Sequence, residues 1–282
     1  MTERDTFIRE SMRSQWAQRT VAYTAFAALH TARYAAPLLD RVAVRPGERV
    51  LDVATGPGVV AVAAAERVGP SGEVLATDLA PEWEAVVAQR AAEHGLGNVR
   101  FAAMGAERLE LADASVDLAL CQFGLMFVPD PVAALREMRR VLRPGGRVGV
   151  TVWSVAERAV YVSLPRRVLA ALMPPPAEPA QRLPGPLDLG EPRLLERHAR
   201  AAGFEACTVE PVMVEAIFAD PELFWVGQVV NGSAQVREAV EALDAAGRER
   251  LHETMIAELE RYRRGVQIVL PSEALILTAP GA

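Results

Sequence analysis

The fold of this chain is decided by the stretch Val50-Leu51-Asp52-Val53-Ala54-Thr55-Gly56-Pro57-Gly58. Its first four residues predict a short, buried strand, and the glycines that follow let the backbone turn sharply into a helix starting near Val59. A side chain at Gly56 or Gly58 would keep a flat ligand from lying against this loop. The stretch therefore predicts a strand, a glycine-rich loop and a helix N-terminus that together contact a ligand.

Asp78 comes twenty residues after the last of these glycines. It follows a second apolar run, Val74-Leu75-Ala76-Thr77, so we expect it at the carboxyl end of the next strand. A carboxylate at that place can accept hydrogen bonds from both hydroxyl groups of a ribose. Strand, loop, helix, strand and acid together predict a nucleoside-binding crevice at the carboxyl end of a parallel sheet, and hence a nucleotide-type cofactor.

Two cofactors fit this crevice. The run Gly56-Pro57-Gly58-Val59-Val60-Ala61 matches the dinucleotide pattern, which allows alanine at its third position, so a nicotinamide-dependent oxidoreductase is one alternative. Asp52 argues against it, because a buried carboxylate would repel a pyrophosphate but attract the α-amino and sulfonium groups of S-adenosyl-L-methionine. If Asp52 instead braces the loop by accepting backbone N–H bonds, either cofactor fits. The chain contains no lysine, which excludes a Tyr-Lys hydride site.

Five motifs between residues 45 and 155 resemble those of class I S-adenosylmethionine-dependent methyltransferases, in particular the ubiquinone/menaquinone-type (UbiE-like) small-molecule branch. They lie at residues 50–58, 76–78, 105–109, 115–127 and 135–147. One such motif is weak evidence, whereas five in the right order and spacing are strong. There are two departures: Ala54 replaces the first loop glycine of the family, and Gly105 replaces an aspartate that would lie next to the adenine.

The resemblance implies an α/β fold with a Rossmann-like, seven-stranded, mostly parallel sheet that has helices on both faces. It divides the chain into an N-terminal helical lid (1–44), a cofactor-binding core (45–155) and a part that completes the sheet and carries a helical cap over the acceptor pocket (156–282). Periodicity and turn signals place the strands at about 49–53, 73–77, 98–102, 116–121, 147–153, 205–218 and 274–278. Helices are expected at about 6–40, 59–68, 81–94, 131–142, 157–172, 192–202 and 220–264, with Asp130 as the cap of the fourth and a turn at 143–146 after it. Trp16 and Tyr23 are the residues of the lid that we expect over the mouth of the cofactor site.

The resemblance also implies the residues that contact S-adenosyl-L-methionine. Asp52, Gly56 and Gly58 should frame its methionine part, and Asp78 should hold the ribose. The full set of expected cofactor residues is Asp52, Ala54, Thr55, Gly56, Gly58, Asp78, Leu79, Gly105, Ala106, Glu107, Gln122 and Phe123. Because Gly105 has no carboxylate, backbone N–H groups around Ala106 and Glu107 are expected to hold the adenine. Gln122 and Phe123 end the fourth strand, where cofactor and acceptor meet.

Methyl transfer from a sulfonium is an in-line displacement for which the cofactor carries the activation and the protein supplies alignment. A general base is needed only when the acceptor must first lose a proton. His30 in the lid and His252 in the expected cap are the candidates for such a base. No group of residues has the spacing of a metal site, so we expect no metal.

Composition limits the partners. The net charge of −6 argues against a nucleic acid, which needs clustered basic residues. The chain has no apolar stretch of about 18 residues, so we expect no membrane span. Its first residues do not resemble an apolar signal segment. Cys121 and Cys207 read as buried thiols rather than a disulfide. We expect a cytoplasmic monomer or homodimer.

The sequence thus predicts a methyltransferase that modifies oxygen or carbon of a small organic acceptor, in secondary or quinone-type metabolism. Besides the nicotinamide enzyme, a second alternative remains: a methyltransferase fold that uses the cofactor only as a scaffold, or not at all. Gly105 is the residue that keeps this alternative open.

Overall fold

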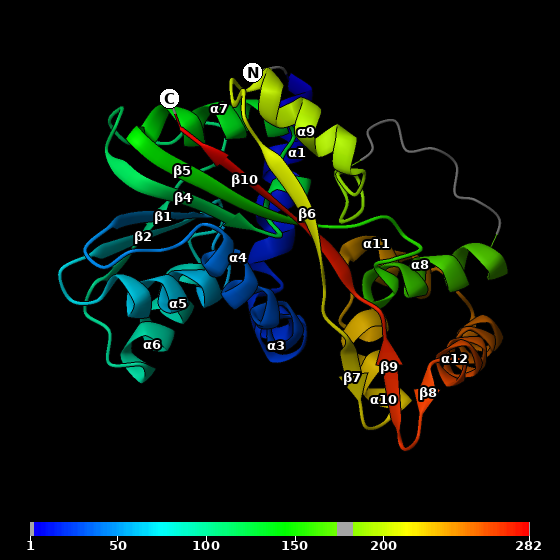
Figure 1. Cartoon of the computed structure of the whole chain (residues 1–282). Coiled ribbons are helices and arrows are strands. Elements are labelled where there is room, and N and C mark those ends of the chain that lie inside the picture. The colour runs from blue at the N-terminus through cyan, green and yellow to red at the C-terminus, as the bar shows by residue number, and fades with distance from the viewer. Residues whose placement is uncertain (1–2, 174–182, 282) are drawn as a thin grey trace.

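A computed structural model describes residues 3–173 and 183–281 of the chain (Figure 1). Its main feature is a seven-stranded sheet in the order β3-β2-β1-β4-β5-β10-β6. The strands are β1 (Arg49–Val53), β2 (Glu73–Asp78), β3 (Val99–Ala103), β4 (Val116–Gln122), β5 (Leu142–Trp153), β6 (Thr208–Met213) and β10 (Glu273–Pro280). The first five pair in parallel, whereas β10 pairs antiparallel with both β5 and β6. The predicted fold class is confirmed.

Helices cover both faces of this sheet. On one face lie α4 (Ala35–Arg41), α5 (Val59–Val68) and α6 (Trp83–Glu93), and on the other lie α7 (Pro131–Val141) and α9 (Pro192–Ala201) (Figure 1). Helix α1 (Glu3–Ala17) lies at the carboxyl ends of the strands instead. The central strand β4 is buried on both faces, as Leu118, Ala119, Leu120 and Cys121 are almost inaccessible to solvent. A strand buried on both faces reads as a continuous apolar run, which is why the sequence located β1 and β4 so closely.

Turn and cap residues set the ends of the helices. Gly58 and Gly69 flank α5, and both have positive φ angles, 75° and 67°. Residues other than glycine adopt such angles only at a cost in conformational energy. Asp130 caps α7 by accepting a hydrogen bond from the backbone N–H of Ala133 at 2.9 Å. These bounds agree with the sequence-based predictions.

Strand β5 begins earlier than predicted. It starts at Leu142 instead of about residue 147, because the expected turn at 143–146 is built into the strand as a bulge. Val116 pairs with Leu142 and Leu118 with Arg147, so β5 has three more residues than β4 between the two pairs. Gly145, with φ at 77°, makes this bulge possible.

The N-terminal segment 3–41, called the lid below, is helical in short pieces. After α1 come α2 (Thr20–Ala22), a π-helix η1 (Tyr23–Ala27), α3 (Ala28–Thr31), a 3₁₀ turn η2 (Ala32–Tyr34) and α4. The sequence predicted one or two helices here. Where the lid meets the sheet, α4 packs against α5 and β5.

The C-terminal part holds a second, three-stranded sheet in the order β7-β9-β8. Its strands are β7 (Ala216–Phe218), β8 (Arg263–Arg264) and β9 (Gln267–Leu270), and its helices are α8 (Val160–Leu172), α10 (Pro221–Phe224), the π-helix η4 (Trp225–Val230), α11 (Ala234–Glu241) and α12 (Ala245–Glu260). We call α8 together with residues 214–272 the cap. Figure 1 shows it beside the main sheet, reached through β6 and β10.

Two sequence-based predictions were wrong in the cap. The expected strand at 205–218 is two strands, β6 and β7, which belong to different sheets. The chain leaves the main sheet between them, where the backbone N–H of Val214 donates to the carbonyl of Ser272 at 3.2 Å. The helices expected at 220–264 are present but end at Glu260, and β8 and β9 follow around Gly265, whose φ is 61°. The domain boundaries at 44 and 155 stay predictions.

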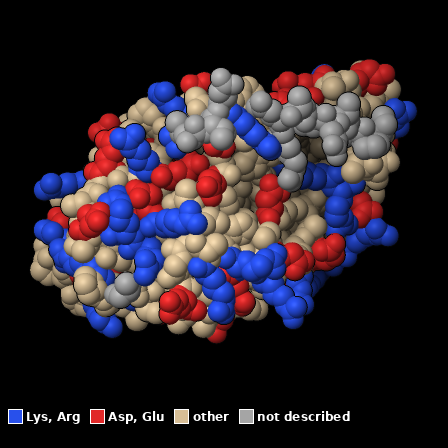
Figure 2. Space-filling model, turned by 90° about the horizontal axis from the view of Figure 1, so that it is seen from above, with Lys and Arg blue, Asp and Glu red and all other residues tan. Residues whose placement is uncertain are grey.

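Charged side chains of both signs are interspersed over the face seen in Figure 2. None of the helices within residues 3–173 and 183–281 combines the length and the apolar character that a bilayer span requires.

Candidate functional site

A cavity opens where β1, β2, β3 and β4 end, under the lid. The loops that follow these strands supply one wall, and α1, η1 and α3 supply the other. The cavity is lined by Arg9, Met12, Trp16, Tyr23, Thr31, Asp52, Ala54, Thr55, Gly56, Pro57, Val59, Val60, Asp78, Leu79, Trp83, Met104, Gly105, Ala106, Glu107, Gln122, Phe123, Gly124, Phe127, Val128 and Pro129. Of the expected cofactor residues, all except Gly58 belong to this lining. Their contact with the cofactor itself stays a prediction.

Gly58 has a different place. A Cβ atom on it would lie 3.1 Å from Cγ2 of Val87 on α6, so this glycine lets the loop pack closely on a neighbouring helix. The geometry gives no support to the predicted contact between Gly58 and the cofactor.

Asp78 connects the loop after β1 with the end of β2. Its Oδ2 accepts a hydrogen bond from the N–H of Gly56 at 2.9 Å, and its Oδ1 accepts one from the N–H of Ala80 at 3.0 Å. Burial raises the pKa of this carboxyl to about 6, and the backbone N–H groups offset part of that effect. Asp78 therefore braces the glycine loop while it lines the cavity, and each carboxylate oxygen keeps a lone pair for a ligand hydroxyl.

Asp52 is almost fully buried at the end of β1. Its Oδ2 accepts a hydrogen bond from the Thr55 hydroxyl at 2.6 Å, whereas its Oδ1 has no hydrogen-bond partner among the described residues. Burial raises the pKa of Asp52 to about 7; the Thr55 hydroxyl and the nearby backbone N–H of Ala61 lower it, and the charge of Asp78 raises it further. A buried carboxylate oxygen without a donor calls for one from a ligand.

Gln122 provides a second acceptor of the same kind. Its Nε2 donates to the backbone carbonyl of Thr31 in the lid at 3.1 Å, and its Oε1 is buried with no partner in the part of the chain that the structure describes. Both Asp52 and Gln122 line the cavity. The site therefore fits a ligand that brings hydrogen-bond donors and positive charge, such as the α-ammonium group of S-adenosyl-L-methionine, and it does not suit a pyrophosphate.

The lid is closed over the cavity. Nη2 of Arg9 on α1 lies 2.8 Å from Oε2 of Glu107 after β3. The Trp16 ring meets Tyr23 and Phe127 edge-on, each with ring centroids 5.3 Å apart. Trp16 and Tyr23, which the sequence placed over the cofactor mouth, do line the cavity.

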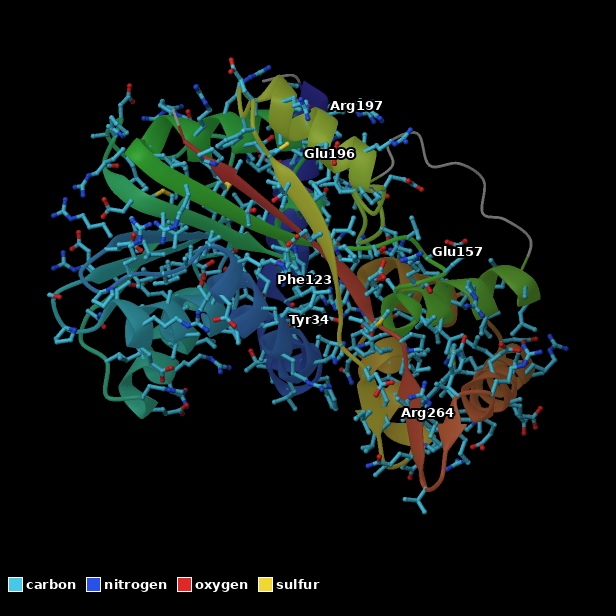
Figure 3. The ribbon with its side chains drawn as sticks, in the orientation of Figure 1. Tyr34, Phe123, Glu157, Glu196, Arg197 and Arg264 are labelled. Carbon is cyan, nitrogen blue, oxygen red and sulfur yellow. The ribbon has the colours of Figure 1, made fainter. Side chains whose placement is uncertain are left out.

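The end of β4 is strained. Phe123 has a φ of 56°, which is uncommon for a bulky residue and is found mostly at functional sites. This conformation stacks its ring on Trp153, with centroids 4.1 Å apart and planes 20° apart, and sets it edge-on to Tyr34 at 5.1 Å. Figure 3 shows Phe123 and Tyr34 close together near the centre of the molecule. Phe123 thus forms an aromatic wall between the cavity and the core that joins lid, sheet and cap.

The two candidate bases lie away from the cavity lining. Nε2 of His30 is 3.0 Å from the Ser272 hydroxyl, and burial, with a smaller effect of Arg33, lowers its pKa to about 3. His252 is on the cap surface, where its Nε2 lies 2.8 Å from Oε1 of Glu222. A base role for either stays a prediction, and the geometry does not favour it.

Several lining residues were not predicted from the sequence. They are Arg9, Met12, Thr31, Pro57, Val59, Val60, Trp83, Met104, Gly124, Phe127, Val128 and Pro129. Most are apolar residues on helices or loops, where no local pattern distinguishes a cavity wall from the core. Gly124 and Phe127 belong to the motif at 115–127 that located Gln122, and Val128 and Pro129 follow it directly, so this motif was the available signal for all four.

Residues 28–174 match the ubiE/COQ5 methyltransferase family. The ubiquinone/menaquinone biosynthesis C-methyltransferase UbiE of Hahella chejuensis is 42% identical over 117 residues, which are 41% of this chain and 47% of that protein. The match therefore spans about half the length of this curated relative.

Among solved structures, a putative methyltransferase from Bacillus halodurans has a TM-score of 0.57 at 19% identity, covering 87% of this chain and 97% of that one. The cyclase SpnF has a TM-score of 0.51 at 22% identity, covering 89% of this chain and 80% of that one. These likenesses show the fold.

The family match spans more than half of the chain and includes the glycine loop, Asp78 and the end of β4. It favours the methyltransferase over the nicotinamide-dependent alternative and confirms S-adenosyl-L-methionine, the methyl donor of this family, as the expected cofactor. The chain belongs to the ubiE/COQ5 methyltransferase family.

Proposed function

We propose that this protein transfers the methyl group of S-adenosyl-L-methionine to a carbon or oxygen atom of a small, largely apolar acceptor with an electron-rich ring. One observation carries the proposal. The cavity at the carboxyl ends of the parallel strands combines the unpartnered Asp52 Oδ1 with an aromatic wall at Phe123. The first feature suits a cationic cofactor, and the second suits an apolar acceptor beside it.

Each part of the cofactor has a group to receive it. Asp52 would accept a hydrogen bond from its α-ammonium group, and the free lone pairs of Asp78 would accept from the ribose hydroxyls. Leu79 and the backbone from Gly105 to Glu107 would flank the adenine. The cofactor brings the activated methyl group, so the protein needs only to hold the two reactants in line.

The lid excludes water from this arrangement. Trp16, Tyr23 and Phe127 pack over the cavity, and Gln122 ties the end of β4 to the lid through Thr31. Among the described lining residues the ionisable ones are Arg9, Tyr23, Asp52, Asp78 and Glu107. The two aspartates are assigned to the cofactor, and Glu107 is paired with Arg9.

No free carboxylate or imidazole among the described lining residues is thus available as a strong base. This supports an acceptor that is already nucleophilic, such as a hydroquinone-type ring or a phenolate. The name of the curated relative, a C-methyltransferase of quinone biosynthesis, agrees with that chemistry.

The first test is calorimetric titration with S-adenosylhomocysteine, with NADH as the parallel ligand. We expect micromolar binding of S-adenosylhomocysteine alone; binding of NADH alone would refute the proposal. The second test incubates the protein with S-adenosyl-L-methionine carrying a labelled methyl group and a panel of hydroquinones, phenols and amines. Label in the hydroquinones or phenols supports the proposal.

Tight cofactor binding with no labelled product from any panel member would favour a non-catalytic use of the cofactor. The fold by itself does not decide this, because one structure that shares it is a cyclase by name. A matched pair of variants links the label to the site. Asp52→Asn should abolish transfer, whereas Asp40→Asn, on the exposed side of α4, should not.

A further inference from the structure

We infer that Arg9 of the lid binds the adenine base of the cofactor, so that the base is held by a residue of the lid as well as by the sheet. The inference rests on the proposed placement of the cofactor. It concerns a residue 96 positions before Gly105, in a helix outside the motifs that located the site.

The first observation is the position of the Arg9 guanidinium. A Cβ atom built on Gly105 would lie 3.8 Å from Cζ and 3.9 Å from Nε of Arg9, and 3.6 Å from Cδ1 of Leu79. The guanidinium therefore lies directly over the backbone of Gly105, at the end of the cavity formed by the loop after β3. That end is the one to which the base is assigned, since Asp78 at the end of the neighbouring strand β2 is assigned to the ribose.

The second observation is an unused donor. Nη2 of Arg9 is held by Oε2 of Glu107 at 2.8 Å, but its Nε is buried and has no hydrogen-bond partner among the described residues. An N–H group of a guanidinium that is withdrawn from water without an acceptor is costly, and a ligand acceptor would remove this cost. The side chain as a whole is 25% exposed, so the guanidinium is partly desolvated before any ligand binds.

The third observation is the partner that fixes Arg9. Oε1 of Glu107 accepts from the N–H of Asp130 at 3.2 Å, so the carboxylate is held by the loop that precedes α7 while it holds Arg9. Adenine presents ring nitrogens that accept and one amino group that donates. Arg9 and Glu107 present the complementary groups side by side. The Nε–H of Arg9 can donate to a ring nitrogen, and each carboxylate oxygen of Glu107 keeps a lone pair that can accept from the amino group. Leu79 adds an apolar surface for the ring.

Since Arg9 is on α1, this contact would form only when the lid is closed. The lid would then contribute to cofactor affinity directly, beyond shielding the methyl group from water.

The experiment compares three variants by titration with two ligands. Arg9→Met removes the donor and the ion pair. Arg9→Lys keeps a positive charge for Glu107 but lacks the Nε–H group and the planar fork. Arg13→Met, four residues along the same helix at an exposed position, is the matched control. The ligands are S-adenosylhomocysteine and 5′-methylthioadenosine, which has the adenine and ribose but neither the ammonium nor the carboxylate of the amino acid.

We expect Arg9→Met and Arg9→Lys to weaken both ligands by a similar factor, about ten- to hundredfold, as is usual for a hydrogen bond from a charged group. Arg13→Met should bind both ligands like the wild type. Circular dichroism and thermal melting establish whether each variant is folded. If Arg9→Met does not fold, the milder change Arg9→Lys carries the test.

Three results would overturn the inference. Wild-type affinity of Arg9→Met would show that no contact exists. Full affinity of Arg9→Lys would show that only the ion pair to Glu107 matters. A loss for S-adenosylhomocysteine without a loss for 5′-methylthioadenosine would place Arg9 at the cofactor carboxylate. If the wild type binds neither ligand, the proposed function itself fails, and this outcome is distinct from the other three.

Discussion

A Cβ atom placed on Gly124 would lie 2.4 Å from the Cβ of Ala54. The loop after β4 and the loop after β1 therefore touch with no room for another methyl group. Both loops are also strained, because Ala54 and the neighbour of Gly124, Phe123, have φ angles of 54° and 56°. Two strained loops in contact hold the floor of the cavity rigid.

Gly124→Ala should lower the free energy of unfolding by about 1–3 kcal/mol, because the new methyl group must displace Ala54 or Cys121, whose Sγ is 3.0 Å away. The double variant Ala54→Gly/Gly124→Ala should recover most of this loss, since glycine also adopts the positive φ at position 54 without strain. Urea unfolding measures both. Gly97→Ala, which meets no atom within 4 Å, is the control and should change little. If Gly124→Ala is as stable as the wild type, the contact between the loops is looser than described.

Cofactor affinity should depend on pH through Asp52 and Asp78. Burial raises their pKa values to about 7 and about 6, so both are largely protonated at pH 5.5 and charged at pH 8. The α-ammonium group of the ligand pairs best with the charged form of Asp52, and the ribose hydroxyls donate best to the charged form of Asp78. The affinity for S-adenosylhomocysteine should therefore fall by up to about tenfold per pH unit as pH is lowered below 7.

Asp52→Asn should bind more weakly at pH 8 and lose most of this pH dependence. The comparison is made by calorimetry between pH 5.5 and 8, with Asp40→Asn as the exposed control. An affinity that is the same at both ends of this range would contradict the assignment of the ammonium group to Asp52.

The stability of the free protein should respond to acid through His30. Its folded pKa of about 3 lies below the ordinary value of 6.5, so between these values the unfolded chain binds a proton that the folded chain does not. The free energy of unfolding therefore decreases as pH falls from 6.5 toward 3, with a slope of up to about 1.4 kcal/mol per pH unit from this residue. Asp52 and Asp78 act with the opposite sign, because their folded pKa values are raised above the usual 3.8, so the effect of His30 is read from the difference between a His30 variant and the wild type.

His30→Gln can still hydrogen-bond to Ser272 but does not titrate. Its free energy of unfolding, measured in urea at pH 7, 6 and 5, should rise relative to that of the wild type as pH falls, by up to about 1.4 kcal/mol per pH unit below 6.5. His94→Gln, at an exposed site, is the matched control and should follow the wild type. Equal slopes for all three proteins would mean that His30 is more accessible than the structure indicates.

His252→Ala should keep wild-type methyl transfer. The side chain lies on the cap surface against Glu222 and Trp225 and is not part of the cavity lining. The turnover number with a responsive acceptor is the measurement. A loss of a hundredfold or more without a change in stability would make His252 the base that the sequence suggested and would require the cap to move toward the cavity.

The sequence was most informative where local chemistry determines local structure. Helix α5 lies within its predicted bounds because glycines with positive φ stand on either side of it, and β1 and β4 follow apolar runs that only a buried strand explains. The cofactor loop was predicted in the same way, from Gly56 and from the acid at the end of β2.

The rest depends on contacts between distant segments. β8 has two residues and β9 four, too few for an alternating pattern, and they pair only because the turn at Gly265 brings them together. Arg9 is held in the site by its ion pair with Glu107, which lies 98 residues away in the sequence. Gly58 carries the same local signal as Gly56, and only the packing of Val87 shows that it faces a helix.

The link between the two sheets has an evolutionary consequence. Residues 214–272 leave the main sheet from β6 and return to it through the adjacent strand β10, and the bond from Val214 to Ser272 closes the base of this excursion. Because its two ends lie side by side, such a segment can be lengthened, shortened or exchanged as a cassette without moving the strands that carry Asp52 and Asp78. The family match ends at residue 174 and so leaves this segment outside the shared part, which means that relatives can inherit a different cassette on the same strands.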